Sequence, residues 1–87
     1  VFGTHTHVLT ADNCVLEGGT GYITDIGMCG VKNSVLGVDK DIVIDKFRFN
    51  MPKRFDKAQG PSMINGCIFS IDKSNGKCIS TELVSFE

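Results

Sequence analysis

The placement of glycine is the strongest constraint on how this chain folds. Six of its ten glycines fall between positions 18 and 37, where they break the sequence into pieces too short for an ordinary helix. Short strands are therefore expected at 14–16 and 21–24, with 25–37 mostly loop. Residues 1–2 are expected to end a further strand. The clearest helical pattern comes after these glycines.

A single helix is predicted over about 39–50. Asp39 is expected to be its N-cap, accepting a hydrogen bond from a backbone N–H of the first turn, and Pro52 ends it. Apolar residues recur at helical spacing on one face, which is expected to pack against a sheet. The residues of this face are Val43, Ile44, Phe47 and Met51.

A β-hairpin is predicted at the C-terminal end of the chain. An apolar strand over 67–72 runs into a turn with the Asn75-Gly76 pair that favours tight hairpins, and the chain returns over 77–86. A shorter strand is expected before the hairpin, over 54–58. These elements together indicate an α/β chain with one helix and a C-terminal hairpin.

The cysteines indicate reduced thiols. Four cysteines in 87 residues fall below the density of disulfide scaffolds, and none of their spacings is C-x-x-C. The predicted hairpin register, with Asp72 near Lys77, places Cys67 opposite about Glu82. A disulfide between Cys67 and Cys78 is therefore not expected. Reduced thiols are typical of a cytoplasmic protein.

The charge balance argues against two classes of partner. Nine Lys and Arg against ten Asp and Glu give a net charge of −1, which is not typical of a nucleic-acid or anionic-membrane surface. No apolar run approaches the roughly 18 residues that a membrane-spanning helix needs. Neither a membrane nor a stable nucleic-acid complex is expected.

The chain's two histidines lie two residues apart, at His5 and His7. On an extended backbone such residues point to the same side, so their imidazoles can reach one metal ion or straddle two. Thr4 and Thr6 would then point into the scaffold, and Asp12 is a candidate for orienting a histidine from behind. The same spacing also occurs on surface loops that bind nothing, so an incidental pair remains open.

Two other features have structural interpretations. The glycines of 18–21 suggest a phosphate-binding loop, but position 24, where a third glycine would open a helix, is Thr24; turn glycines are the better interpretation. Asp25 follows an apolar strand, where a loop cap is more typical than a site carboxylate. No Ser-His-Asp or Cys-His set can be ordered from the sequence.

Three blocks of the sequence resemble the C-terminal third of the bacterial YmdB-like metallophosphoesterases. The Arg54-Phe55 pair and the hairpin over 65–76 follow in the same order, so the resemblance covers nearly the whole chain. The blocks are GTHTHVLTAD at 3–12, GGTGYITDIGM at 18–28 and SVLGVDK at 34–40.

The resemblance implies a fold and an activity. The fold is the C-terminal part of a calcineurin-like metallophosphoesterase sandwich, in which 1–87 is the C-terminal segment of one domain whose upstream part is absent. Two metal ions are implied, iron or manganese with zinc or magnesium as alternatives, with His5 on one and His7 on the other. The implied reaction is hydrolysis of 2′,3′-cyclic nucleotides to 3′-nucleotides, or of other phosphodiesters, by metal-activated hydroxide.

The family's other metal ligands and its Asn-His catalytic pair have no counterpart here. The general acid is therefore expected upstream, and His5 and His7 are the only site residues assigned. The segment alone is expected to be inactive and to need upstream chain, or a second copy in a homo-oligomer, to cover its open edges. The alternative is a non-enzymatic binding or assembly module in which the H-x-H loop is incidental.

Overall fold

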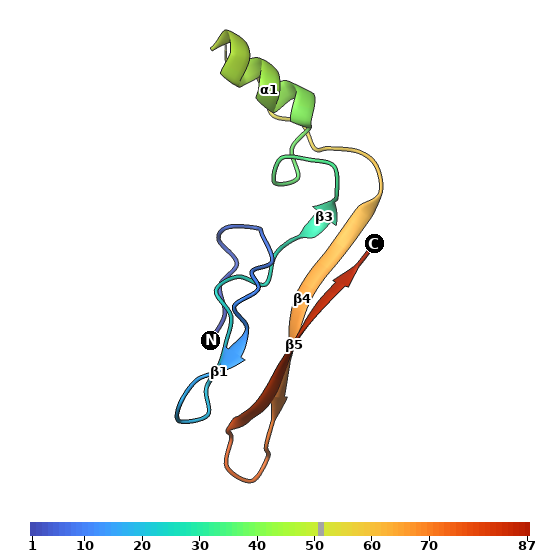
Figure 1. The fold of residues 1–87 in the computed structure, drawn as a ribbon. Coiled ribbons are helices and arrows are strands. Elements are labelled where there is room, and N and C mark those ends of the chain that lie inside the picture. The colour runs from blue at the N-terminus through green and yellow to red at the C-terminus, as the bar shows by residue number, and fades with distance from the viewer. Residues whose placement is uncertain (51) are drawn as a thin grey trace. The chain divides into compact units, whose positions relative to one another are not determined.

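The computed structural model describes residues 1–50 and 52–87, shown as a ribbon in Figure 1. The chain divides into two compact units. The first, here called the hairpin unit, comprises Val1–Met28 and Ile64–Phe86. The second, here called the helix unit, comprises Cys29–Met63 and Glu87. In chain order the elements are β1 (Cys14–Val15), β2 (Gly21–Tyr22), β3 (Cys29–Val31), α1 (Lys40–Phe49), β4 (Ser62–Ile71) and β5 (Cys78–Phe86).

The predicted C-terminal hairpin is confirmed. Strands β4 and β5 pair antiparallel and run side by side in Figure 1, and the strand order of their sheet is β3-β4-β5. The turn is closed by the Asp72 amide, which donates to the Lys77 carbonyl over 2.9 Å. Strand β4 starts at Ser62, earlier than the sequence predicts.

The predicted register of this hairpin holds beside the turn, where Asp72 lies near Lys77, and is off by one residue farther along the strands. Cys67 lies opposite Leu83, and Glu82 lies opposite Ile68. The cause is an irregularity between Ser70 and Ile71, since a bulge places one extra residue in a single strand and shifts every pair beyond it. Cys78 lies opposite Ile71, four positions along β4 from Cys67, and both thiols are free.

The core of the hairpin unit forms where the glycine-rich loop meets β5. Strand β1 pairs antiparallel with β2, and Ile23, just after β2, is fully buried. The Cys78 amide donates to the Gly19 carbonyl over 2.7 Å. A Cβ atom on Gly21 would lie 2.7 Å from both the Cys78 sulfur and a ring carbon of Phe69. Glycine is therefore required at position 21 by packing.

The helix unit confirms the predicted helix bounds. The Asp39 carboxylate caps α1 by accepting from the Asp41 amide at 2.9 Å and from the Ile42 amide at 3.5 Å. Asn50 ends the helix in the left-handed conformation, with φ at 50°. No helix among the described residues is long and apolar enough to cross a membrane.

The prediction that the apolar face of α1 packs against a sheet is wrong for most of the residues on that face. Val43 is buried, but Ile44 is 54% exposed and Phe47 is 83% exposed, while Met51 lies outside the described residues. Helical periodicity shows which residues share a face, but it does not show what lies opposite that face.

Two shorter predictions are also corrected. The strand expected over 54–58 is reduced to one isolated bridge between Lys57 and Val38, with the Ala58 amide bonded to the Gly37 carbonyl over 2.9 Å. Conversely, β3 lies in a region predicted to be mostly loop. Its pairing with β4 is non-local, and the Lys32 amide beside it donates to the Pro61 carbonyl over 3.0 Å.

The close approach at Gly21 can be tested by adding one methyl group. Gly21→Ala should lower the free energy of unfolding by about 1–3 kcal/mol, because the new Cβ overlaps Cys78 and Phe69. Gly66→Ala is the matched control, since a Cβ there would meet the nearest Val84 atom at an ordinary 3.4 Å. Alanine in a strand interior should be neutral or slightly stabilising. Urea unfolding of both variants, made in the full-length protein, measures the difference; equal effects would contradict the assigned packing.

Candidate metal-binding loop

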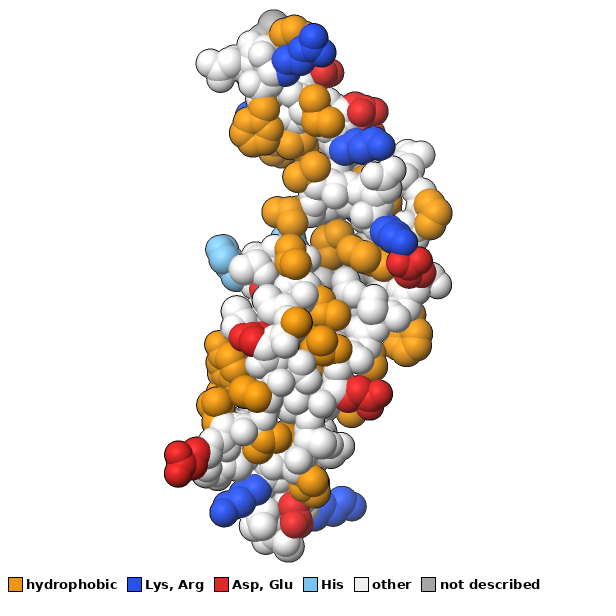
Figure 2. All heavy atoms as spheres, in the orientation of Figure 1, with side chains coloured by type: hydrophobic (Ala, Val, Ile, Leu, Met, Phe, Trp, Pro, Cys, Tyr) orange, Lys and Arg blue, Asp and Glu red, His pale blue; other side chains and the backbone are white. Residues whose placement is uncertain are grey.

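Both histidines lie on the surface of the hairpin unit, and their imidazoles are drawn pale blue in Figure 2. Between them, Thr6 is tied to the interior. The Thr6 amide and its hydroxyl both donate to Asp25 Oδ2, over 2.7 Å and 2.8 Å. The loop is thus anchored at its middle residue, while His5 and His7 on either side remain exposed to solvent.

The anchor is the carboxylate of Asp25, which is only 1% exposed. Its other oxygen, Oδ1, accepts from the Gly27 amide over 2.8 Å. Burial acts to raise the pKa of Asp25, but the hydrogen bonds from Gly27 and Thr6, together with the charge on His7, hold that pKa below its ordinary value of 3.8. Asp25 therefore stays ionised, and its interpretation as a loop cap is confirmed.

The backbone bends at His7, where φ is 61°. Residues other than glycine seldom adopt this left-handed conformation, although histidine tolerates it better than most. The extended backbone predicted across His5 and His7 is therefore wrong, and alternation along a strand does not set the direction of the two side chains. Non-glycine residues in such conformations concentrate at functional sites, where the surrounding structure holds them in place.

A second carboxylate braces the loop from outside. Asp12 accepts from the Thr10 hydroxyl over 2.6 Å and from both the amide and the hydroxyl of Thr24. These bonds, with Thr10 the largest contributor, lower the pKa of Asp12 from 3.8 to about 2. The role predicted for Asp12, orienting a histidine, is wrong, because its carboxylate is engaged by threonines.

The two sides of the loop are joined through Thr10. Its amide donates to the Asp25 carbonyl over 3.1 Å, and its hydroxyl accepts from the Asp25 amide over 3.0 Å. The sequence did not indicate this link, because fifteen positions separate the partners and threonines are common in any polar loop. The Thr6 hydroxyl is turned toward the buried Asp25, as predicted, although Thr6 and Thr4 are both exposed residues.

The loop offers an incomplete set of metal ligands. Within 1–50 and 52–87, no group of three or more His, Cys, Asp or Glu side chains is placed to hold a metal ion. Asp25 and Asp12 are committed to hydrogen bonds within the loop. The arrangement can therefore supply two imidazole nitrogens to an ion whose other ligands come from elsewhere.

Comparison with known proteins gives consistent matches along the chain. A family model described as "YmdB-like protein" matches residues 1–84. A 2′,3′-cyclic-nucleotide 2′-phosphodiesterase of Bacillus subtilis is 44% identical over 84 residues, which is 97% of this chain and 32% of that protein. A putative phosphatase/phosphodiesterase of Mycoplasma pneumoniae is 38% identical over 85 residues, covering 97% of this chain and 30% of its own length.

Two solved structures share the fold. A crystal structure described as a novel phosphatase from Mycoplasma pneumoniae superimposes with a TM-score of 0.91 at 37% identity, covering 98% of this chain and 31% of that one. A hypothetical protein from Thermus thermophilus gives a TM-score of 0.89 at 30% identity, covering 98% and 33%. The predicted fold class is confirmed, and the chain spans about a third of the length of the relatives it matches.

The two braced carboxylates predict a specific acid sensitivity. Both pKa values are depressed, so the stability they contribute is complete above the unfolded-state value of 3.8 and is lost as the pH falls through the folded-state values, which is about 2 for Asp12. Asp12→Asn should lower stability at pH 7 and flatten the loss below pH 4. Urea midpoints of the full-length protein measured between about pH 7 and 2 test this, with the exposed carboxylate variant Glu17→Gln as control. An unchanged slope in Asp12→Asn would contradict the assignment.

Proposed function

Because the chain belongs to the YmdB-like protein family, we propose that it is part of a metal-dependent phosphodiesterase. The proposed substrates are 2′,3′-cyclic nucleotides, converted to 3′-nucleotides, or other phosphodiesters. Support comes from the names of the relatives, one a 2′,3′-cyclic-nucleotide 2′-phosphodiesterase and one a putative phosphatase/phosphodiesterase. The observation that carries the proposal is the anchored loop, in which Thr6 is hydrogen-bonded to the buried Asp25 carboxylate while both imidazoles on either side are exposed.

We assign His5 and His7 as metal ligands, His5 to one ion and His7 to the other. The residues fit this role because imidazole nitrogen suits transition metals, and neither side chain is buried in the protein. Two bound cations would supply charge stabilisation to an attacking hydroxide and to the phosphoryl oxygens. Iron or manganese is the proposed pair, with zinc or magnesium as alternatives; magnesium's preference for oxygen ligands makes it the weaker one.

Asp25 is a positioning residue in this proposal. Its carboxylate accepts hydrogen bonds from the Thr6 amide and hydroxyl. These bonds fix the backbone at Thr6, between the two histidines. The positive charge of a protonated His7 lies close enough to Asp25 to help lower the pKa of that carboxyl group. Imidazole must be neutral to bind a metal, so metal affinity should fall as the pH is lowered.

The proton donor to the leaving group is assigned to chain outside 1–87, because the Asn-His pair that the resemblance implies has no counterpart in this sequence. We therefore expect the segment alone not to turn over substrate or fold stably. A cytoplasmic location is also proposed, supported by the free thiols of Cys14, Cys67 and Cys78. The alternative, a non-enzymatic binding or assembly module, is favoured by one observation, the lack of a third ligand among the described residues.

Replacing each histidine in the full-length protein tests the assignment. His5→Ala and His7→Ala should each remove about one metal ion per chain and lower 2′,3′-cyclic AMP hydrolysis at least about 100-fold, because each removes a ligand from one ion. Metal content is measured by elemental analysis, and turnover with added Mn²⁺ or Fe²⁺. Thr4→Ala is the control, because Thr4 lies on the same loop and its side chain is exposed.

The outcomes separate the two functions. Unchanged metal content and rate in both variants would show that His5 and His7 are not metal ligands. A wild-type protein that contains no metal after purification, and takes up none when Mn²⁺ or Fe²⁺ is added, would favour the binding module. Metal retained in both variants with a loss of rate would place the histidines at the substrate instead of at the ions.

A further inference from the structure

Cations and phenylalanines alternate along one segment of the helix unit. The segment 46–57, here called the basic-aromatic segment, begins Lys46-Phe47-Arg48-Phe49 and continues after Pro52 with Lys53-Arg54-Phe55-Asp56-Lys57. Five cations and one acid give it a local charge of +4, in a chain whose net charge is −1. Net charge therefore conceals a strongly basic stretch.

The phenylalanines of this segment are on the surface. Phe47 is 83% exposed, Phe49 is 57% exposed and Phe55 is 49% exposed. A hydrophobic core gains nothing from rings in this position. Exposed aromatic residues grouped together are typical of a surface that binds a partner.

The cations lie against the rings. The Lys46 ammonium is 4.6 Å from the centroid of the Phe55 ring, and the Arg48 guanidinium is 5.2 Å from that of Phe49. Charge and aromatic surface are thus interleaved. An amphipathic helix that lies in a membrane surface instead separates its cationic and apolar faces. The interleaved pattern favours a ligand that carries negative charge and flat rings together.

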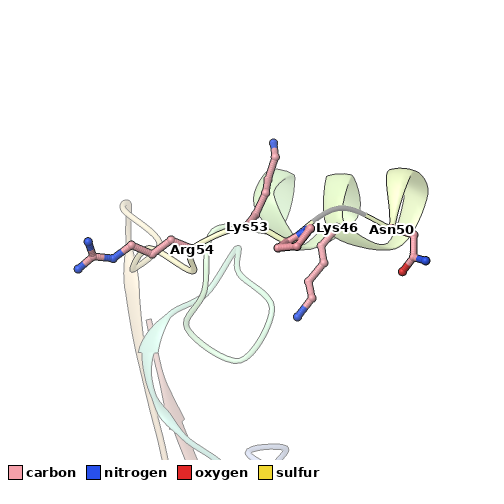
Figure 3. A pocket seen from close by; sticks show the side chains of 5 residues that line it. Lys46, Asn50, Lys53 and Arg54 are labelled. Atoms are coloured by element: carbon pink, nitrogen blue, oxygen red, sulfur yellow. The ribbon is translucent and has the colours of Figure 1, made fainter.

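A cavity of about 440 Å³ lies at the C-terminal end of α1, lined by Lys46, Asn50, Pro52, Lys53 and Arg54. In Figure 3 the side chains of Lys46, Lys53 and Arg54 point in different directions. They do not converge on one point, as they would around a single phosphate group. Spread charges suit a polymer whose phosphates follow one another along a chain.

The ion pair between Lys53 and Asp45 leaves this surface accessible. Lys53 donates to Asp45 Oδ2 over 2.9 Å, but the two side chains are 45% and 40% exposed. Exposed pairs of this kind contribute little to stability and exchange readily for another anion. Lys46, Arg48 and Arg54 can meet phosphates without breaking an ion pair that the structure describes.

We infer that the basic-aromatic segment binds single-stranded nucleic acid, with phosphates on Lys53 and Arg54 and bases stacked on Phe47 and Phe49. Aromatic platforms beside cations are the usual means of binding single strands without sequence preference. This proposal differs from the expectation, drawn from net charge, that no stable nucleic-acid complex forms. It does not depend on His5, His7 or any metal.

Binding is measured with the full-length protein in EDTA, by fluorescence anisotropy of labelled 12-nucleotide oligo(U) and oligo(dT). A dissociation constant of about 1–100 μM is expected at roughly 50 mM salt. The double variant Lys53→Gln/Arg54→Gln should bind about tenfold more weakly and lower the salt slope by about 1.4, since each phosphate contact contributes about 0.7. Lys73→Gln, in the turn of the hairpin unit, removes a cation elsewhere and should change binding less than about twofold.

The aromatic contribution is tested separately by Phe47→Leu. This change keeps an apolar side chain but removes the stacking surface, so affinity should fall about tenfold while the salt slope stays constant. Circular dichroism melts verify folding. If the Phe47 variant were unstable, the Gln double variant and its slope would still decide the matter.

Three results would overturn the inference. One is no anisotropy change up to about 100 μM protein. Another is an equal loss of affinity in Lys73→Gln. The third is binding to phosphatidylserine vesicles, or a dimer lost on Phe47→Leu, without oligonucleotide binding; these would assign the surface to a membrane or to a second copy.

Discussion

The loop that carries both histidines keeps its shape because one buried carboxylate, that of Asp25, holds it from inside. A buried charge is costly unless it is fully hydrogen-bonded, and Asp25 meets that condition through Thr6 and Gly27. The need to keep this charge hydrogen-bonded also restrains the loop. Any movement of the loop that broke these bonds would leave the charge unpaired, so the carboxylate fixes the backbone around Thr6.

The loop's far side is fixed by the hairpin. Gly27 has φ at 81°, and a Cβ atom there would lie 2.8 Å from the Cβ of Asn65 on β4. The Asn65 amide group donates to the Met28 carbonyl over 3.1 Å, next to that contact. The strand pairing of β4 with β5 is thereby linked to the loop, and the hairpin supports the loop as well as completing a sheet.

Local features of this fold could be predicted from the sequence, and non-local ones could not. Asp39 and Asn50 bound the helix through contacts within a few residues, so its ends were predictable. The hairpin register was not, because a bulge at Ser70/Ile71 has no sequence signature. The exposure of Phe47 depends on what lies opposite α1, which periodicity does not describe.

The candidate site shows the same division. The His5 and His7 pair stood out by its spacing, and Asp25 was recognised as a loop cap from its place after a strand. Its partner Thr6 could not be identified, since nineteen positions separate the two. The alternation of basic and aromatic residues in the basic-aromatic segment can be read from the sequence. The prediction missed it because it used only the net charge of the whole chain.

The most direct test of the metal-loop account is anomalous X-ray diffraction from crystals of the full-length, metal-loaded protein, with data collected at the absorption edges of iron and manganese. The account predicts two anomalous peaks, one at bonding distance, about 2.0–2.2 Å, from an imidazole nitrogen of His5 and one likewise from His7. Thr6 should remain bonded to Asp25 in that structure. Two metal peaks with neither histidine within bonding distance, or no peak beside the loop, would contradict it.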